Sequence, residues 1–296
     1  MKTLRMKTVR LGSLALFIAL FGSACGQPPG EGADALKLIA ASADTTTAEG
    51  TARMTMHMTM SMPQGEVTMD AEGSQDFANQ RGEMTMTMQM PPEAGAMGGE
   101  QKIEMVFADL IVYMKFPMMS ELAPGSKPWI SMDLQKMGEE AGMDFGSLMQ
   151  SGGNDPSQML EWLRGVSGDI EVVGEEEVRG APATHYRGTI DLKNVLEQMA
   201  GEMRSQMEST IDEMTETLGA STFPIDVWID GEGRVVRMAQ SFDFEKGATA
   251  GAFMTMTMDF FDFGIPVDVR VPPASQTTDF QELMGSMGSM GSGTAP

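Results

Sequence analysis

The sequence predicts an α+β domain in which a strongly curved antiparallel sheet of about ten to eleven strands wraps over a few helices. Several segments alternate Met with Thr or Ser, which is the period of a β-strand with two different faces. Short connections between such segments are typical of a meander. One long segment repeats apolar residues every three or four positions, which predicts a helix with a single face to bury. A sheet of this size must curl to bury its apolar face, and the long helix is expected to cover its open side.

The N-terminal half of the domain is predicted to be one helix followed by a meander. Asp34 is a suitable N-cap, and apolar residues with helical spacing follow it. Residues 63–65 contain Pro and Gly, and residues 79–82 contain Asn and Gly, so both are predicted turns. The expected strands are 51–62, 66–77, 83–90, 101–107, 110–116 and 129–132.

The C-terminal half interrupts further strands with helices. Asp155 followed by Pro156 predicts a helix start, and the longest helix is expected over 191–218. The remaining strands are expected at 166–173, 184–190, 223–230, 235–244 and 252–261. The tail 276–296 is a low-complexity segment rich in Gly, Ser and Met, and it is predicted to be disordered.

The chain is unusually rich in methionine, with 33 Met and only 14 Phe in the full sequence. Its unbranched thioether re-packs easily, which suits a surface that accepts variable apolar ligands. Most apolar stripes on strands belong to the packed core. The methionine stripes can therefore be interpreted either as packed core or as the lining of a ligand site. The candidate ligand-binding residues are Met54, Met56, Met58, Met60, Met84, Met86, Met88, Met254, Met256 and Met258 on strands, and Met199, Met203 and Met207 on the long helix.

Cys25 is the only cysteine, and it follows a basic, then apolar, then small-residue leader. This is the arrangement of a bacterial lipoprotein signal, although Gly22 stands where Leu is usual. The apolar run is too short to span a bilayer. We therefore expect Cys25 to be lipidated and to hold the chain on the extracytoplasmic face of the cell membrane. The predicted organisation is a signal peptide over 1–24, a tether over 25–33, one domain over 34–275 and the tail over 276–296.

The charge of the chain excludes nucleic acid as a partner. Without the leader, the chain has 16 basic and 42 acidic residues, which give a formal charge of −26. Such a surface also repels anionic lipid head groups, so affinity for lipid beyond the anchor must come from apolar side chains. A second cysteine is missing from the sequence, so an intramolecular disulfide cannot form.

Three motifs carry a resemblance to a known family: residues 180–192, 224–234 and 263–273. In this order, behind a lipoprotein cysteine, they resemble the actinobacterial LppX/LprA/LprF/LprG lipoprotein family, which has the LolA-like fold. The resemblance implies a half-barrel around helices, with a cavity that receives the acyl chains of glycolipids, triacylglycerol or related envelope lipids. It implies no cofactor, and it leaves a transporter partner in the envelope unassigned.

The sequence has features that bear on three alternative functions. Thioethers bind Cu(I), but on a strand His57 points away from Met56 and Met58, which splits the apparent Met-His-Met site. An enzyme is not expected, because two histidines and a lipidated cysteine without a nucleophile motif leave no triad, and His185 is expected to be a packed strand residue. A structural lipoprotein with a closed core remains the third alternative.

Replacing Cys25 by Ala tests the predicted anchor. The variant should move from the membrane into the soluble envelope fraction, because two or three acyl chains are what make attachment durable. Fractionation followed by mass spectrometry of the mature N-terminus measures both attachment and cleavage. A variant that stays fully membrane-bound contradicts the prediction.

Overall fold

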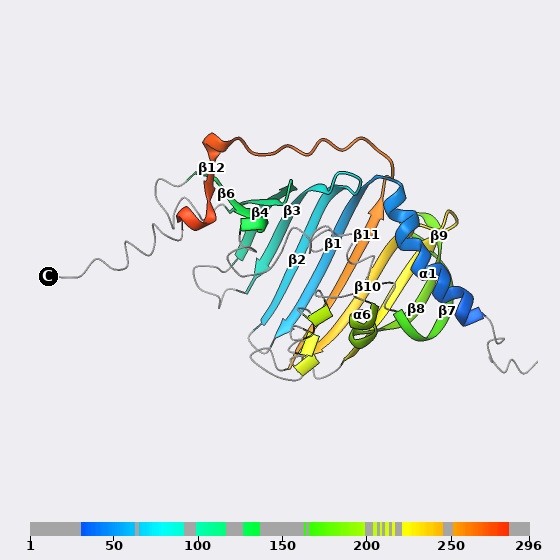
Figure 1. Ribbon diagram of the computed structural model, residues 1–296. Helices are drawn as coiled ribbons and strands as arrows, with labels where there is room; N and C mark the ends of the chain where they lie inside the picture. The colour runs from blue at the N-terminus through cyan, green and yellow to red at the C-terminus, as the bar shows by residue number, and fades with distance from the viewer. Residues whose placement is uncertain are drawn as a thin grey trace, which may run out of the picture.

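The computed structural model of this protein is a mostly-β fold with one twelve-stranded sheet and few helices (Figure 1). The predicted signal peptide and Cys25 lie outside the residues that it describes. These are residues 31–62, 65–91, 99–116, 127–136, 163, 166–198, 204–205, 208, 211–212, 215–216, 221–244 and 251–283.

Two antiparallel meanders form the sheet. The first comprises β1 (Thr51–Met62), β2 (Gly65–Asp76), β3 (Arg81–Met90), β4 (Gly99–Ala108), β5 (Ile111–Lys115) and β6 (Trp129–Asp133). The second comprises β7 (Val166–Val178), β8 (Ala181–Asp191), β9 (Thr222–Asp230), β10 (Val235–Phe244) and β11 (Ala252–Phe261). They join because β11 pairs with β1, which gives the order β12-β6-β5-β4-β3-β2-β1-β11-β10-β9-β8-β7.

All eleven predicted strands appear as β1 to β11, but the predicted start of the disordered tail is wrong. Within that segment, β12 (Thr277–Asp279) pairs in parallel with β6, and Leu283 is buried. The Lys127 ammonium also donates to the carbonyls of Ala274 and Thr277 (3.0 and 2.8 Å). A three-residue strand is too short to show a period, so its pairing comes from tertiary contacts. Residues 284–296 lie outside the described part of the chain.

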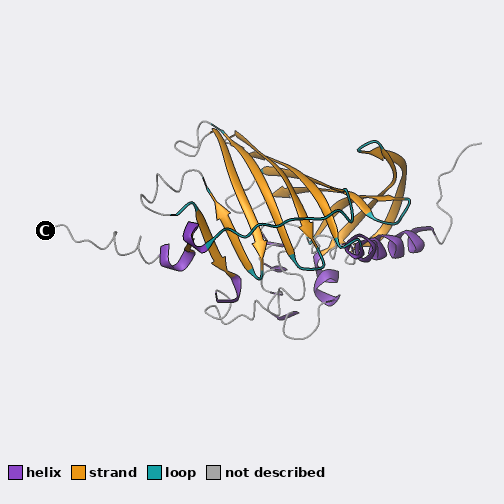
Figure 2. Ribbon diagram, turned by 90° about the horizontal axis from the view of Figure 1, so that it is seen from above, coloured by secondary structure: helices purple, strands orange, loops and turns teal. Residues whose placement is uncertain are grey.

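The predicted strong curvature is also wrong, because the sheet is twisted and open and is not strongly curled (Figure 2). Curvature in a sheet is concentrated at bulges, where one strand carries an extra residue. The pairings from β10 through β11 and β1 to β6 keep an unbroken register. Register shifts occur between β7 and β8 and between β9 and β10, so the bending devices lie at one end of the sheet.

Helix α1 (Glu31–Ala48) packs across β7, β9 and β10 at that end of the sheet (Figure 1). It begins before Asp34, which is therefore not the N-cap that the sequence predicts. The Thr46 hydroxyl, at the buried end of α1, accepts the Val235 N–H at 2.8 Å and ties the helix to β10. Among the described residues, no helix has the length and apolar content needed to cross a membrane.

The predicted long helix begins where expected, as α6 (Leu192–Gln198). The Asp191 carboxylate accepts the Lys193 N–H at 2.9 Å and so acts as the cap. Further along, the described residues between 204 and 216 are helical, and Ile211 is buried in the main core. Leu163 is the described part of the helix predicted after Pro156, and it is fully buried.

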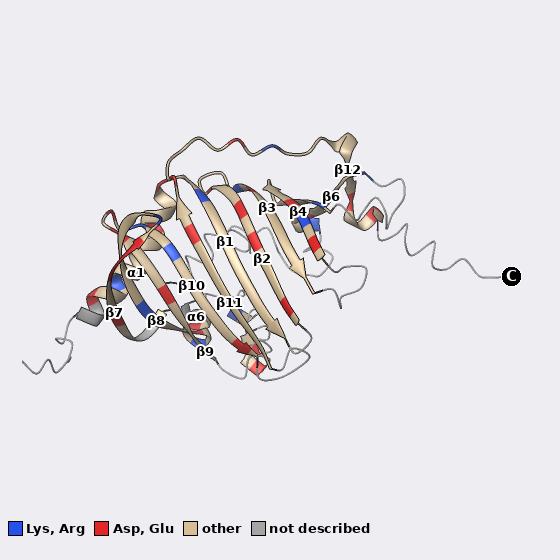
Figure 3. Ribbon diagram, turned by 180° about the vertical axis from the view of Figure 1, so that it is seen from behind, with Lys and Arg blue, Asp and Glu red and all other residues tan. Residues whose placement is uncertain are grey.

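The main core lies on one face of the sheet, which we call the inner face. It contains Ile39 and Ala43 of α1, Leu196 of α6, and Met54 and Met258 of the sheet. The opposite face, called the outer face, carries charged residues such as Asp70, Glu72, Arg237 and Asp259, which line a cavity there. Figure 3 shows how charged residues are distributed along the strands. After β11 the chain runs along one rim of the sheet towards β12 (Figure 1).

Candidate functional site

The alternating methionines of β1, β3 and β11 lie on the inner face, as the period of two predicts. Met54 is 2% exposed and belongs to the main core, where Met56, Met84 and Met254 pack at its edge. The intervening Thr and His residues point outward and line a cavity on the other side. The separation of the two faces is therefore confirmed.

Strand pairing turns these stripes into one continuous surface. Residues directly opposite each other on neighbouring strands point to the same side, within reach of long side chains. The register aligns Met256 of β11, Met58 of β1, Met69 of β2 and Met88 of β3 in a single row across the sheet, called here the four-methionine row. We define the methionine face as Met54, Met56, Met58, Met60, Met69, Met84, Met86, Met88, Met254, Met256 and Met258.

The methionine face is only partly buried. Met54 and Met258 are buried, whereas the other nine residues of the face keep intermediate exposure. Met54 and Met258 lie at the level of Phe260 and Met238, next to the packed core, and the exposure rises along the strands away from it. A partly exposed apolar surface of this kind is a feature of binding sites more often than of closed cores.

The residues predicted for this face differ from the observed ones in two ways. Met199, Met203 and Met207 of the long helix lie outside the described residues, so their assignment stays a prediction. Met69, Met105 and Met114 of β2, β4 and β5 extend the inner-face rows and were missed. Each of them stands alone on its strand, without the Met-x-Met repeat that marks β1, β3 and β11. Alternation with Val67 and Ala71 would have placed Met69 on this face.

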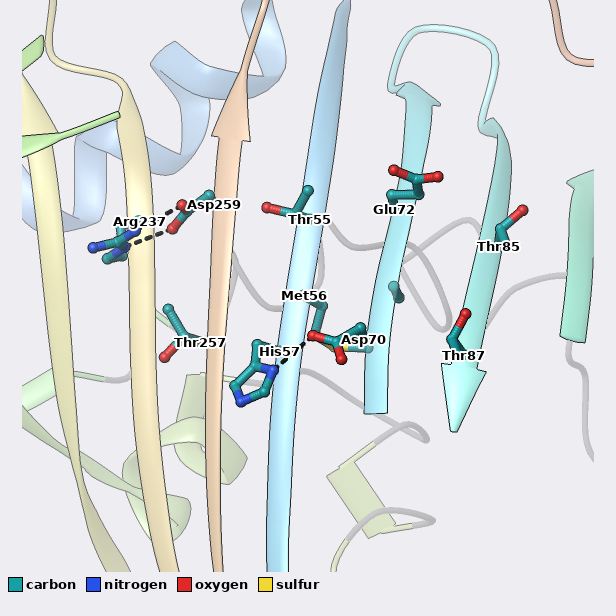
Figure 4. Close-up of a pocket in the computed structure, with 11 residues that line it drawn as sticks. Thr55, Met56, His57, Asp70, Glu72, Thr85, Thr87, Arg237, Thr257 and Asp259 are labelled. Atoms are coloured by element: carbon teal, nitrogen blue, oxygen red, sulfur yellow. Dashed lines mark hydrogen bonds and ion pairs between the residues drawn. The ribbon is translucent and has the colours of Figure 1, made fainter. Parts of the chain in front are cut away.

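Two open cavities lie on the outer face. The first, of about 410 Å³, covers the middle of β1 and its neighbours (Figure 4). The second, of about 780 Å³, lies between the sheet and the rim segment 265–270. The first is lined by Thr55, His57, Asp70, Glu72, Thr85, Thr87, Arg237, Thr257 and Asp259, with Met56 and Ala71. Hydroxyl and charged groups dominate it, so it is not the cavity for acyl chains that the resemblance implies, nor one lined mainly by the candidate methionines.

His57 and Asp70, which line this cavity, form a hydrogen-bonded chain with Thr59 beside it, and the chain has the connectivity of a catalytic triad. His57 Nδ1 lies 2.7 Å from Asp70 Oδ1, and its Nε2 lies 3.3 Å from Thr59 Oγ1. The backbone of β1 is paired on both sides, with β2 and β11, so its N–H groups are not free to form an oxyanion hole. The side chains of His57 and Asp70 are also 57% and 67% exposed, so water reaches them and is not excluded from the chain. The arrangement does not support nucleophilic catalysis.

The second histidine is buried in a polar cluster on the outer faces of β7, β8 and β9. His185 Nδ1 lies 3.0 Å from Glu176 Oε1, and its Nε2 lies 2.6 Å from Asp226 Oδ1. The ring also stacks on Trp228 with centroids 4.1 Å apart. Because both ring nitrogens are engaged and the side chain is 6% exposed, His185 is a packed strand residue, as predicted.

The described residues contain no group of three or more His, Cys, Asp or Glu side chains arranged to hold a metal ion. His57 lies on the outer face while Met56 packs against the core of the inner face. The geometric objection to a Met-His-Met copper site is therefore confirmed.

No model of a known protein family matches the sequence. A Streptomyces griseus protein, described as an uncharacterized 31.2 kDa protein of the rplA-rplJ intergenic region, is 30% identical over 162 residues, which cover 54% of this chain and 50% of that protein. A candidate lipoprotein of Streptomyces coelicolor is 29% identical over 168 residues, 56% of this chain and 47% of that protein. The chain thus spans about half the length of the curated relatives that it matches.

Two crystal structures of lipoproteins align with most of the chain. LppX of Mycobacterium tuberculosis is 15% identical with a TM-score of 0.46, and the alignment covers 80% of this chain and 99% of LppX. LprF of Mycobacterium bovis is 14% identical with a TM-score of 0.42, covering 82% and 98%. The chain is similar in structure to these lipoproteins.

The buried cluster around His185 predicts a dependence of stability on pH. Hydrogen bonds to Glu176 from the Trp228 indole (2.8 Å) and then from His185 lower the pKa of Glu176 below its ordinary value of 4.5. A carboxylate with a lowered pKa stabilises the fold above pH 4.5, and this stabilisation is lost as the pH falls through the folded-state pKa. Trp228→Phe keeps a stacked ring but removes the stronger of these two donors.

We expect the melting temperature of Trp228→Phe to lie below that of the wild type above pH 4.5, and the difference to shrink as the solution is made more acid. Thermal unfolding followed by circular dichroism between about pH 3 and pH 7 measures the difference. Trp129→Phe, at the far end of the sheet, is the control and should show no such trend. A Trp228→Phe difference that stays constant across this range would contradict the assignment.

Proposed function

We propose that this chain is an envelope lipoprotein whose methionine face binds the acyl chains of a lipid or glycolipid and carries or transfers that lipid within the cell envelope. One observation carries the proposal: methionines of β11, β1, β2 and β3 lie side by side in continuous rows and are partly exposed. The similarity to the LppX and LprF lipoproteins and the predicted lipoprotein signal before Cys25 are consistent with it.

The chemistry of the face suits acyl chains. Each methionine presents an apolar, polarizable side chain with three rotatable bonds, so neighbouring residues can adjust to chains of different length and shape. The driving force is burial of apolar surface, worth about 25 cal/mol per Å² removed from water. Binding of this kind needs no covalent step and no cofactor.

The outer face has the opposite role in this proposal. Carboxylates such as Asp70 and Glu72 alternate there with threonines, and the chain as a whole is strongly acidic. This surface is repelled by anionic head groups, so it disfavours flat adsorption on the membrane. An anchored domain would therefore keep its outer face in water and offer its inner face to lipid.

A charge placed on the methionine face tests this function. Met58→Arg puts a guanidinium in the middle of the four-methionine row, where burial beneath an acyl chain would leave it unpaired. We expect the lipid that co-purifies with the Cys25→Ala protein, quantified by mass spectrometry, to fall by roughly tenfold or more in this variant. Thr59→Arg, one residue along on the outer face, is the matched control and should retain the lipid.

Circular dichroism on both Arg variants separates loss of binding from loss of folding. A folded Met58→Arg protein that carries as much lipid as the Thr59→Arg control would contradict the proposal. Absence of co-purifying lipid in the parent protein would contradict it as well.

The four-methionine row also supports a second candidate, Cu(I) binding. Three or four thioethers from adjacent strands lie at neighbouring positions, and soft sulfur ligands select Cu(I). The described residues place no histidine or cysteine on that face beside them. The row would then act with thioether ligands alone.

Leucine substitution distinguishes lipid binding from copper binding. In the triple variant Met58→Leu, Met69→Leu and Met256→Leu, we expect the amount of bound lipid to be kept and the range of accepted chains to narrow, because branched side chains adopt fewer shapes. Each swap should cost less than about 1.5 kcal/mol of stability. Lipid mass spectrometry and a Cu(I) competition titration are the measurements. The double variant Met54→Leu and Met84→Leu, on the same face but outside the four-methionine row, is the control for Cu(I) affinity.

A large loss of Cu(I) affinity in the triple variant alone, with lipid loading unchanged, would favour the copper function. Unchanged lipid range and unchanged Cu(I) affinity would instead favour a closed core without a ligand.

A further inference from the structure

Gln240 is a buried amide on the apolar inner face of β10. It lies between Met238 and Phe242, which both belong to the main core, and alternation along the strand gives it their orientation. The residue is 5% exposed. In the described structure, neither its Nε2 nor its Oε1 has a hydrogen-bond partner.

An unpartnered buried amide of this kind is rare and unfavourable. The large majority of buried polar side-chain atoms in folded proteins have a partner, and those that do not have lost their hydration without compensation. A purely structural core would be served better by an apolar side chain, like those of Met238, Phe242, Ile225 and Met256 around this position. The amide therefore requires an explanation outside packing.

The position of Gln240 relates it to the methionine face. The register places it opposite Ile225 of β9 on one side and opposite Met256 of β11 on the other. It therefore extends the four-methionine row by one strand. Ile225 is 1% exposed and Gln240 is 5% exposed, whereas Met256 and Met58 are partly exposed. Gln240 thus stands at the boundary where the closed core ends and the accessible methionine face begins.

We propose that Gln240 is the polar recognition point of the lipid site, and that it selects an acyl lipid with a free hydroxyl group next to its ester linkage. This inference rests on the proposed function. Acyl chains would extend from Gln240 along the four-methionine row, and the polar end of the ligand would meet the amide.

The chemistry of the amide sets the class of ligand. Nε2 offers two donors and Oε1 is an acceptor, so a full match needs a ligand with both an acceptor and a donor. An ester carbonyl supplies the acceptor and a hydroxyl supplies the donor. A diacylglycerol carries both groups, whereas a triacylglycerol carries acceptors only and would leave Oε1 unpaired. An alkane would leave both atoms unpaired.

Access to the amide depends on movable neighbours. Met256 and Met238 flank Gln240 across and along the strands, and both have the flexible side chain that allows re-packing. A ligand can therefore reach a group that is buried in the unliganded protein, at the cost of rearranging side chains and without moving the strands.

Gln240→Met removes both polar atoms while nearly preserving the length and volume of the side chain. Binding of three probes to the Cys25→Ala protein should be compared with and without this substitution. The probes are dioleoylglycerol, its methyl ether at the free hydroxyl, and trioleoylglycerol. Ser241→Ala, on the next residue and the outer face, is the control, and Gln240→Asn is a second variant that keeps the amide but withdraws it by one methylene.

We expect the parent and Ser241→Ala proteins to bind dioleoylglycerol roughly tenfold more tightly than its methyl ether, and Gln240→Met to bind the two within about twofold of each other. The preference of Gln240→Asn for dioleoylglycerol over its methyl ether should lie between those of the parent and Gln240→Met. The melting temperature of ligand-free Gln240→Met should rise, because an unpaired amide is removed from the core.

The outcomes separate the two proposals. If all proteins bind the three probes but Gln240→Met keeps the full preference for the free hydroxyl, Gln240 is not the recognition point and the proposed function stands. If no probe binds the parent protein, the proposed function fails and this inference fails with it. If Gln240→Met is unfolded, a Gln240→Asn protein that keeps the full preference overturns the inference.

Discussion

The pairing of β1 with β11 is the contact on which the rest of this fold depends. Each meander by itself has neighbouring strands that are close in sequence, but β1 and β11 come from opposite ends of the domain. Their unbroken antiparallel register brings the methionine runs of both meanders side by side. Without it, each half would expose an apolar edge strand, which is a template for aggregation. With it, the methionine face becomes continuous.

Because side chains alternate along a strand, the same register determines which residues meet on the apolar inner face and which meet on the polar outer face. Met56 faces the core while His57 faces solvent, and the pairing of His57 with Asp70 on β2 follows from the register that also aligns Met58 with Met69. A shift of one residue would exchange the two faces completely. The large apolar content of one side therefore specifies the position of every polar group on the other.

The sequence predicts local features of this structure well and tertiary features poorly. Period-two alternation is a property of neighbouring residues, so the eleven strands β1 to β11 and the inner orientation of Met54 and Met56 were predicted correctly. The curvature was not, because it depends on how bulges such as those in β7 and β10 are distributed over the whole set of paired strands, and strand pairing is a tertiary property. Likewise β12 owes its existence to β6, and the isolated Met69 joins the face only through its partners.

Gln240 illustrates the same limit most clearly. In the sequence it is one polar residue within an alternating strand, and a buried amide normally has a partner that becomes visible only in three dimensions. Its lack of a partner in the described structure is meaningful because two of its neighbours, Met238 and Met256, have flexible side chains that can move aside while the paired backbone of β10 and β11 stays in place. A flexible apolar surface on a rigid sheet adapts to many acyl chains, and one fixed amide at its edge would give that adaptable surface a preferred orientation for its ligand.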